Sequence, residues 1–291
     1  MKGMGRVLKM AGIIAGVILL LTGFGIWRSI DKLQVAMNVK EAWSRQDGTV
    51  YKDLTYGNKD YQKYDLYIPQ SASVDEKQSV ILFVHGGGWS GGSKKEMAFA
   101  CKRYAKAGYM TATIEYGLLG DKNPENSMDT IMEDIDGCIR AMKAEIEGRG
   151  YEVKNIAIGG GSAGGHLSLL YAYQFAEASA IPIAFVASQS GPVGVDYGAE
   201  GVSDEVVAAA RNASPIQFVN EDTVPTLLCH GQKDMIVPYA GTMALIEKLK
   251  QYNVEYSFVD YPNSNHTLES DPDSHKQYHS EMLAFCRKYF E

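Results

Sequence analysis

The sequence predicts an α/β domain with a mostly parallel central sheet flanked by helices. Short apolar runs rich in β-branched residues alternate with longer helix-like segments through the middle of the chain, as in parallel strands joined by crossover helices. The expected strands are residues 79–84, 111–115, 156–158, 224–230 and 256–261, and the expected helices are residues 94–107, 127–147, 163–177, 238–251 and 274–289. Hydrophobic residues make up 45% of the 291 positions and charged residues 22%, which suits one domain with a sizeable core.

The N-terminal end is expected to form a membrane segment. Three basic residues precede an uncharged run at residues 11–27, which Arg28 closes. A run of about 17 residues is at the short end of what spans a bilayer, and its basic flank faces the cytoplasm by the positive-inside rule. We therefore expect a single-pass anchor at 1–30, a stalk at 31–48 and an extracytoplasmic domain at 49–291. The alternative is a cleaved signal peptide and a secreted protein.

The most informative stretch is residues 155–165, which read NIAIGGGSAGG. A strand-like run meets three glycines, reaches Ser162 and continues into a helix-like run. Gly160 to Gly164 therefore fits G-x-S-x-G, the sharp strand-to-helix turn on which hydrolases expose a nucleophilic serine. Glycines at such a turn let strand and helix approach closely. A tight turn with an idle serine is the alternative, so the assignment needs independent support.

Upstream support comes from residues 85–89, HGGGW, which follow the expected strand at 79–84. Successive glycines leave backbone N–H groups uncovered and able to approach a substrate oxyanion. The N–H groups of Gly87, Gly88 and Ala163 are the candidate oxyanion hole. A flexible glycine turn is the alternative reading of these glycines.

Downstream, an acid and a histidine each follow an expected strand. Asp234 lies just beyond residues 224–230, and His266 lies in a polar loop after residues 256–261. The chain order Ser162, Asp234, His266 is that of α/β-hydrolases rather than of chymotrypsin or subtilisin. These three residues are the candidate catalytic triad.

Other titratable residues are weaker candidates. His230 lies at a strand end and is expected to be structural, while Asp260 lies within a strand and ranks second as the acid. His275 and His279 are spaced i, i+4, which could suggest zinc, but a solvated helix face is the preferred reading. No metal or cofactor is expected.

With these motifs in place, the chain resembles the α/β-hydrolase superfamily over roughly residues 50 to 290. Within this superfamily, the HGGG motif resembles that of two groups of esterases. They are the carboxylesterases of the hormone-sensitive-lipase type and the acetyl- and feruloyl-type carbohydrate esterases. Because little sequence is left for the helical cap of the former group, the smaller carbohydrate esterases fit better. The resemblance implies an α/β-hydrolase fold and a serine esterase that forms an acyl-enzyme.

The expected substrate is a small ester, with short acyl groups favoured because no extended apolar lid is present. Residues 191–215 are long enough to form a small lid with a helix near 203–211. Trp89 and Tyr116 are expected to shape the substrate pocket. An acetylated sugar is plausible on the family resemblance alone.

Other classes of function fit less well. A formal net charge of −7 and the lack of a basic stripe argue against nucleic-acid binding. A serine peptidase of the prolyl-oligopeptidase type remains an alternative, although the chain lacks the usual propeller. A non-catalytic interaction protein is the other alternative, although such proteins commonly lose a triad member. The four cysteines show no metal or redox spacing, and the oligomeric state is left open.

Overall fold

A computed structural model describes residues 42–120, 123–194 and 213–290 of the chain. Most of the expected lid, the anchor at 1–30 and residues 31–41 of the stalk lie outside these ranges. A compact unit spans Trp43–Glu291 and holds the whole sheet. None of the helices within the described ranges has the length and apolar character that a membrane crossing requires.

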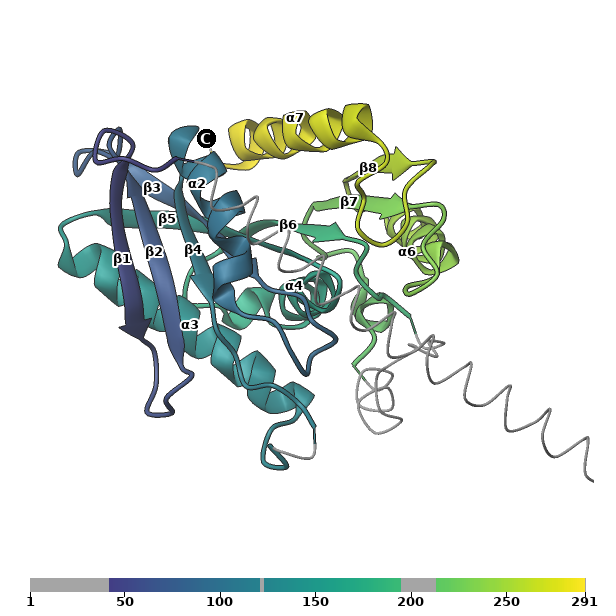
Figure 1. Cartoon of the computed structure of the whole chain (residues 1–291), viewed down its shortest axis with the longest axis horizontal. Helices are drawn as coiled ribbons and strands as arrows, with labels where there is room; N and C mark the ends of the chain where they lie inside the picture. The colour runs from purple at the N-terminus through teal and green to yellow at the C-terminus, as the bar shows by residue number, and fades with distance from the viewer. Residues whose placement is uncertain (1–41, 121–122, 195–212, 291) are drawn as a thin grey trace, which may run out of the picture. The chain divides into compact units, whose positions relative to one another are not determined.

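Eight strands in the described ranges form one sheet in the order β1-β2-β4-β3-β5-β6-β7-β8 (Figure 1). The strands are β1 (Gly48–Thr55), β2 (Lys63–Pro69), β3 (Lys77–Val84), β4 (Met110–Ile114), β5 (Glu152–Gly161), β6 (Ile183–Gln189), β7 (Thr226–Gly231) and β8 (Tyr256–Tyr261). Only β2 runs against its neighbours among these strands, pairing antiparallel with β1 and β4. The other pairs are parallel, so the prediction of a mostly parallel sheet is confirmed.

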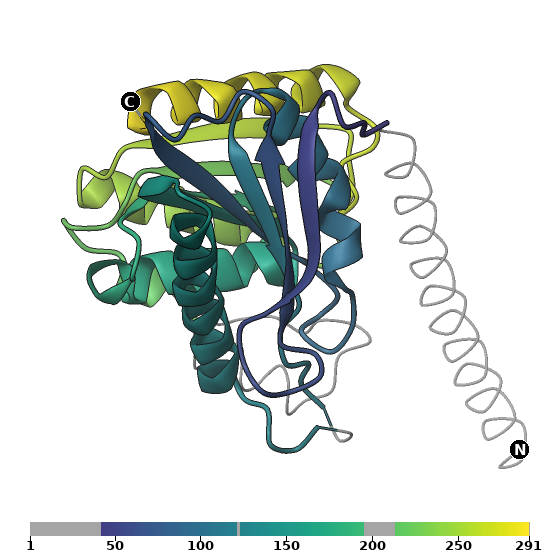
Figure 2. The same ribbon diagram turned by 90° about the vertical axis from the view of Figure 1, so that its left-hand side faces the viewer.

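Helices cover both faces of the sheet, as Figures 1 and 2 show. They are α2 (Ala98–Lys106), α3 (Met128–Gly148), α4 (Ala163–Gln174), α6 (Tyr239–Gln251) and α7 (Pro272–Tyr289). Side chains of a strand alternate between the two faces. In β3, Leu82 packs in the core shared with α3, α4 and α6, whereas Ile81 and Phe83 pack in the core shared with α2 and α7.

Helix α3 illustrates why the helical predictions succeed. Its buried apolar residues recur at helical spacing, from Ile131 through Ile135 and Ile139 to Met142 and Ile146. The helix begins where the Ser127 side chain accepts a hydrogen bond from the Thr130 N–H, a capping box at its N-terminus. Each expected helix is present, with its ends shifted by a few residues.

The structure also adds elements that the sequence pattern does not reveal. Strands β1, β2 and β6 are not predicted, whereas β8 has the expected bounds. The compact unit begins before the expected residue 49, because the Trp43 ring packs edge-on against Tyr67, with ring centroids 5.7 Å apart.

All four cysteines are buried and free. Cys138 lies in the core on the α3 face, and Cys101, Cys229 and Cys286 lie in the core on the α7 face. Burial raises the pKa of each thiol.

A buried ion pair ties the segment after the HGGGW loop to the sheet. Lys94, in the short helix η1 (Lys94–Met97), places its ammonium 2.5 Å from Asp65 Oδ1 and 2.9 Å from Asp53 Oδ1. The Lys94 and Asp65 side chains are each only 7% exposed. The Thr113 hydroxyl donates to the Lys94 carbonyl over 3.1 Å, which joins the same segment to β4.

We expect the Lys94→Met substitution to lower the free energy of unfolding by about 3 kcal/mol, because it leaves the buried Asp65 carboxylate without its counter-ion. Urea denaturation measures the change. The matched control is Lys77→Met, which removes an exposed pair with Glu152 and should cost less than about 1 kcal/mol. Equal losses of unfolding free energy in the two variants would show that the buried Lys94 pair stabilises the fold no more than an exposed pair does.

Candidate active site

The candidate triad residues gather at one edge of the sheet. Ser162 follows β5 directly, Asp234 lies three residues after β7, and His266 lies five residues after β8. Because these strands are parallel, their carboxyl ends meet at the same edge, which is where ligands bind in open α/β sheets. The three residues, which are far apart in the sequence, therefore lie together at one site.

Ser162 occupies a strained backbone conformation between β5 and α4. Its φ of 53° and ψ of −126° lie in a region that residues with a side chain rarely adopt. Two hydrogen bonds hold the turn: the Ser162 N–H donates to the Gln189 carbonyl (2.8 Å), and the His166 N–H donates to the Ser162 carbonyl (3.0 Å). The side chain is therefore presented at the tip of a sharp, fixed turn.

The glycines of the turn are required by close backbone contact. A Cβ atom on Gly160 would lie 2.3 Å from the carbonyl oxygen of Val84, and one on Gly164 would lie 2.1 Å from the same atom. Real Cβ atoms are never found so close to a carbonyl oxygen. The two outer glycines of the G-x-S-x-G pattern therefore let β5 and α4 press against the end of β3.

Ser162, His266 and Asp234 form a continuous chain of hydrogen bonds. The Ser162 hydroxyl donates to His266 Nε2 over 2.9 Å, and His266 Nδ1–H donates to Asp234 Oδ2 over 2.7 Å. The carboxylate can only accept, which places the imidazole proton on Nδ1 and leaves Nε2 free to act as a base. Both distances lie within the reach that proton transfer needs.

The Asp234 carboxylate is buried and fully hydrogen-bonded. Its side chain is 0% exposed, and its Oδ1 accepts the N–H groups of Ile236 (2.8 Å) and Val237 (2.9 Å). Burial acts to raise the pKa of Asp234, but the hydrogen bonds from His230 and His266 and from the backbone outweigh it, so this pKa lies well below its usual value. The group is therefore ionised throughout the neutral range.

A small network shapes the loop that carries His266. Asp271 Oδ2 accepts the Asn263 N–H (2.9 Å) and the Ser264 hydroxyl (2.6 Å), while its Oδ1 accepts from the Asn263 side-chain amide (2.9 Å). The sequence pattern alone indicates no role for Asp271 in this loop. The available signal was its position just before Pro272, because an aspartate followed by proline marks a helix start.

The HGGGW loop lies beside Ser162. A Cβ atom on Gly86 would be 2.9 Å from the Gly161 carbonyl oxygen and 3.4 Å from Ser162 Cβ. Gly87 has a φ of 113° and Gly88 a φ of 58°, conformations that favour glycine. Their role and that of Ala163, the first residue of α4, as oxyanion donors stays a prediction.

The side chains of Trp89, within this loop, and of Tyr116 are buried rather than on an open surface. Trp89 is 3% exposed and donates its Nε1–H to His166 Nδ1 over 3.1 Å. Tyr116 is 1% exposed, donates its hydroxyl to the His85 carbonyl (3.0 Å) and stacks on the His85 ring. Both side chains therefore support the loop, and direct contact with a substrate stays a prediction.

Two buried histidines on either side of the site are neutral. His85 Nδ1–H donates to the Gly86 carbonyl over 2.8 Å, and His166 Nε2–H donates to the Ala213 carbonyl over 2.9 Å. Burial lowers the pKa of each ring to about 4.

The weaker candidates make other contacts. Asp260 accepts the Tyr239 hydroxyl (3.0 Å) and the Gln232 side-chain amide (2.5 Å), and it does not contact His266. His275 and His279 face each other with 3.1 Å between their Nε2 atoms, and the Arg103 guanidinium contacts His279. A guanidinium at this position disfavours a bound cation.

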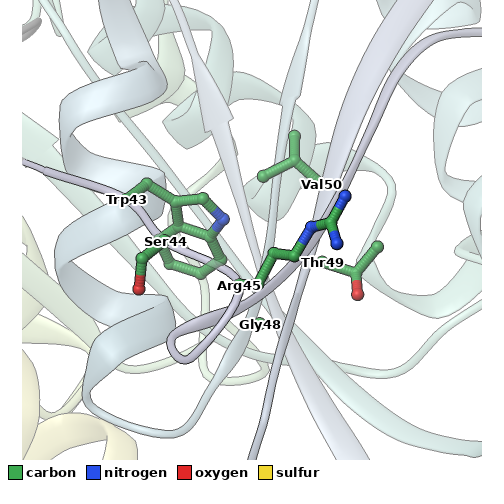
Figure 3. Close-up of a pocket in the computed structure, with 6 residues that line it drawn as sticks. All are labelled: Trp43, Ser44, Arg45, Gly48, Thr49 and Val50. Atoms are coloured by element: carbon green, nitrogen blue, oxygen red, sulfur yellow. The ribbon is translucent and has the colours of Figure 1, made fainter.

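A cavity elsewhere in the unit is lined by Trp43, Ser44, Arg45, Gly48, Thr49 and Val50, at the start of the described chain (Figure 3). No triad residue lines it, so it is separate from the candidate site.

Comparison with known proteins gives a consistent family assignment. The BD-FAE family model matches residues 64–195 and 197–249, which is more than half of the chain. The chain is 25% identical to esterase LipC of Mycobacterium tuberculosis, over 74% of this chain and 59% of that protein. It is 27% identical to the acylamino-acid-releasing enzyme of Arabidopsis thaliana, over 70% of this chain and 30% of that protein.

A solved structure confirms the fold prediction. The truncated form of a carbohydrate esterase from gut microbiota superposes with a TM-score of 0.71 and 19% identity, covering 85% of this chain and 99% of that one. The sheet and its helices are therefore those of an α/β-hydrolase fold. The chain spans about three-fifths of the length of the esterase LipC that it matches.

We expect the free energy of unfolding to fall as the pH is lowered from 6.5 towards 4. An unfolded histidine takes up a proton near pH 6.5, whereas His85 and His166 stay neutral in the folded chain until about pH 4. Linkage then gives a loss of about 1.4 kcal/mol per pH unit for each ring.

The measurement is urea denaturation at pH 6.5, 6.0, 5.5 and 5.0, for the wild type beside His166→Gln. The variant should lose stability less steeply, because one of the two rings no longer titrates. Carboxylates titrate equally in both proteins, so identical slopes would show that His166 is not held neutral.

Proposed function

The chain belongs to the BD-FAE family, and from this premise we propose that it is a serine hydrolase that cleaves carboxylic esters. One observation carries the proposal: Ser162, His266 and Asp234 are joined by hydrogen bonds of 2.9 and 2.7 Å. The similar proteins named above as esterases support the ester bond as the target.

In the proposed reaction, His266 Nε2 takes the proton of Ser162 as Oγ attacks the ester carbonyl. The ionised Asp234 stabilises the imidazolium that forms and keeps its proton on Nδ1. His266 then protonates the departing alcohol, and an acyl group remains on Ser162. Water, activated by the same imidazole, releases the acid and restores the hydroxyl.

The negative charge on the carbonyl oxygen needs donors that are in place before the reaction. The N–H groups of Gly87, Gly88 and Ala163 are the proposed donors, because the glycine loop abuts Ser162 and Ala163 begins α4. A helix start also favours negative charge. Each such donor contributes about 3–4 kcal/mol of transition-state stabilisation in comparable enzymes.

Short acyl groups, with acetyl esters foremost, are the proposed substrate class. The expected lid, residues 191–215, holds no long apolar run that could cover an extended acyl chain. A carbohydrate esterase of the same fold makes acetylated sugars the first natural substrates to screen.

A peptidase is the second candidate, because acylamino-acid-releasing enzymes are among the similar proteins. The same serine, histidine and aspartate would serve an amide bond. An N-acetylated amino-acid p-nitroanilide is therefore included among the substrates below, to test whether the enzyme cleaves an amide bond.

We further propose that residues 1–30 anchor the chain in a membrane with the α/β-hydrolase domain on the extracytoplasmic side. Three basic residues before an uncharged run of about 17 residues support this proposal. Secretion after cleavage of the same segment is the alternative.

We expect the full chain to hydrolyse p-nitrophenyl acetate faster than the butyrate, and the decanoate slowest. The Ser162→Ala variant should lose at least about 10³-fold in kcat/KM, because no nucleophile remains. Ser73→Ala, on the turn between β2 and β3 at the opposite edge of the sheet, is the matched control and should keep full activity.

Full activity in Ser162→Ala would overturn the assignment. Cleavage of the p-nitroanilide without any ester hydrolysis would replace the esterase with the peptidase.

Expressed in a bacterial host, the full chain should stay with the membrane pellet after alkaline carbonate extraction. The Val17→Lys/Leu20→Lys variant places two charges in the span and should move to the soluble fraction, because each charge at the centre of a span costs about 3 kcal/mol. Val74→Lys, at an exposed position, is the control. A wild-type chain shortened by the mass of its first 30 or so residues and recovered as soluble protein would support the secreted form instead.

A further inference from the structure

His230 is a fully buried imidazole that the reaction above does not use. It lies at the carboxyl end of β7 and is 0% exposed. Its Nε2 lies 3.1 Å from Asp234 Oδ2 and 3.0 Å from the Val237 carbonyl oxygen, and both partners are acceptors. Its Nδ1 lies 2.7 Å from the Thr242 hydroxyl. The proton is therefore on Nε2, and Nδ1 accepts from Thr242.

One oxygen of Asp234 consequently serves two imidazoles. Oδ2 accepts from His266 Nδ1 at 2.7 Å and from His230 Nε2 at 3.1 Å, while Oδ1 accepts the N–H groups of Ile236 and Val237. Because two donors share this oxygen, each hydrogen bond is weaker than it would be if that donor bound the oxygen alone. The strength of the hydrogen bond to His266 is therefore set partly by His230.

We propose that His230 is a positioning residue for the proposed ester hydrolysis: its Nε2–H fixes the orientation of the Asp234 carboxylate and limits how strongly Oδ2 binds the His266 proton. The inference rests on the proposed function. Without His230, the carboxylate can rotate about its Oδ1 contacts, and Oδ2 turns its full charge towards His266. The imidazole then gives up its proton less readily and is aimed less well at Ser162.

Among the described residues, Tyr239 links the surroundings of His230 to a second carboxylate, that of Asp260. Tyr239 of α6 packs edge-on against the His230 ring, with centroids 5.7 Å apart, and its hydroxyl donates to Asp260 Oδ1 on β8 over 3.0 Å. Burial raises the pKa of Tyr239 to about 12, so this group is neutral. Asp234 bonds His230 directly, and Asp260, which bonds Tyr239, is unchanged in the variants below.

The test compares His230→Leu with His230→Gln on p-nitrophenyl acetate. Leucine removes the donor, whereas the glutamine side-chain N–H can reach the place of Nε2–H. We expect His230→Leu to lower kcat about tenfold or more with KM nearly unchanged. The acidic limb of its pH–rate profile should move up by about half a pH unit or more, because Asp234 then holds a protonated His266 more strongly.

His230→Gln should restore most of kcat and return the limb to its wild-type position. Thr242→Val, which removes only the hydroxyl that fixes the His230 tautomer, should change the profile in the same direction by less. Equal losses in the Leu and Gln variants with an unmoved acidic limb would overturn the proposal and leave His230 with a packing role. If His230→Leu does not fold, Thr242→Val decides the matter: an acidic limb that moves up supports the proposal, and a wild-type profile contradicts it.

Proton NMR gives a readout that does not need turnover. The His266 Nδ1–H resonance should move downfield in His230→Leu as its bond to Asp234 strengthens, and it should stay in place in His230→Gln. This shift together with a wild type that hydrolyses no ester would show that the proposed function fails while the positioning role holds. An unmoved resonance in an active wild-type enzyme would show the reverse.

Discussion

The site depends on one contact made almost entirely by backbone: the turn between β5 and α4 against the end of β3. Gly160 and Gly164 bring the turn within reach of the Val84 carbonyl oxygen, and no larger residue fits at either position. The helix that follows is buried along nearly its whole length, so it cannot shift to relieve the strain at Ser162. The same contact sets Gly86 against Gly161, which places the HGGGW loop beside the serine.

Charge is distributed around the site in a simple way. Asp234 is a buried, ionised carboxylate, whereas His85 and His166 are buried and neutral. The positive charge that forms during the proposed reaction therefore arises on His266, next to the one carboxylate that binds it. Neutral rings beneath the glycine loop supply hydrogen bonds without competing for that carboxylate.

The sequence was sufficient for the parts of the site that follow from strand order. Ser162, Asp234 and His266 each come after an apolar run, and parallel strands bring such positions to one edge without further information. Strand β1 escaped detection because its exposed and buried residues do not alternate regularly and it has no apolar run. The strand β6 has apolar residues, but its alanines and serine dilute the pattern.

The sequence does not show in which direction the side chains around the site point. Trp89 belongs to the HGGGW loop and Tyr116 lies just after β4. Both side chains nevertheless turn inwards, Trp89 to His166 and Tyr116 to His85. Asp271 closes the His266 loop through contacts that exist only after the loop has formed. His230 was expected to be structural, and its bond to Asp234 could not be predicted because it forms only when the turn after β7 brings the two side chains together.

The four buried thiols have a consequence for how this protein can be studied. An alkylating reagent reaches a thiol only when the layer around it opens, so its rate of reaction reports local unfolding. Cys138 belongs to the α3 layer, whereas Cys101 and Cys286 belong to the layer of α2 and α7. The natural chain therefore carries a separate chemical probe in each of its two helical layers, and comparing their alkylation rates distinguishes cooperative unfolding from the detachment of one layer.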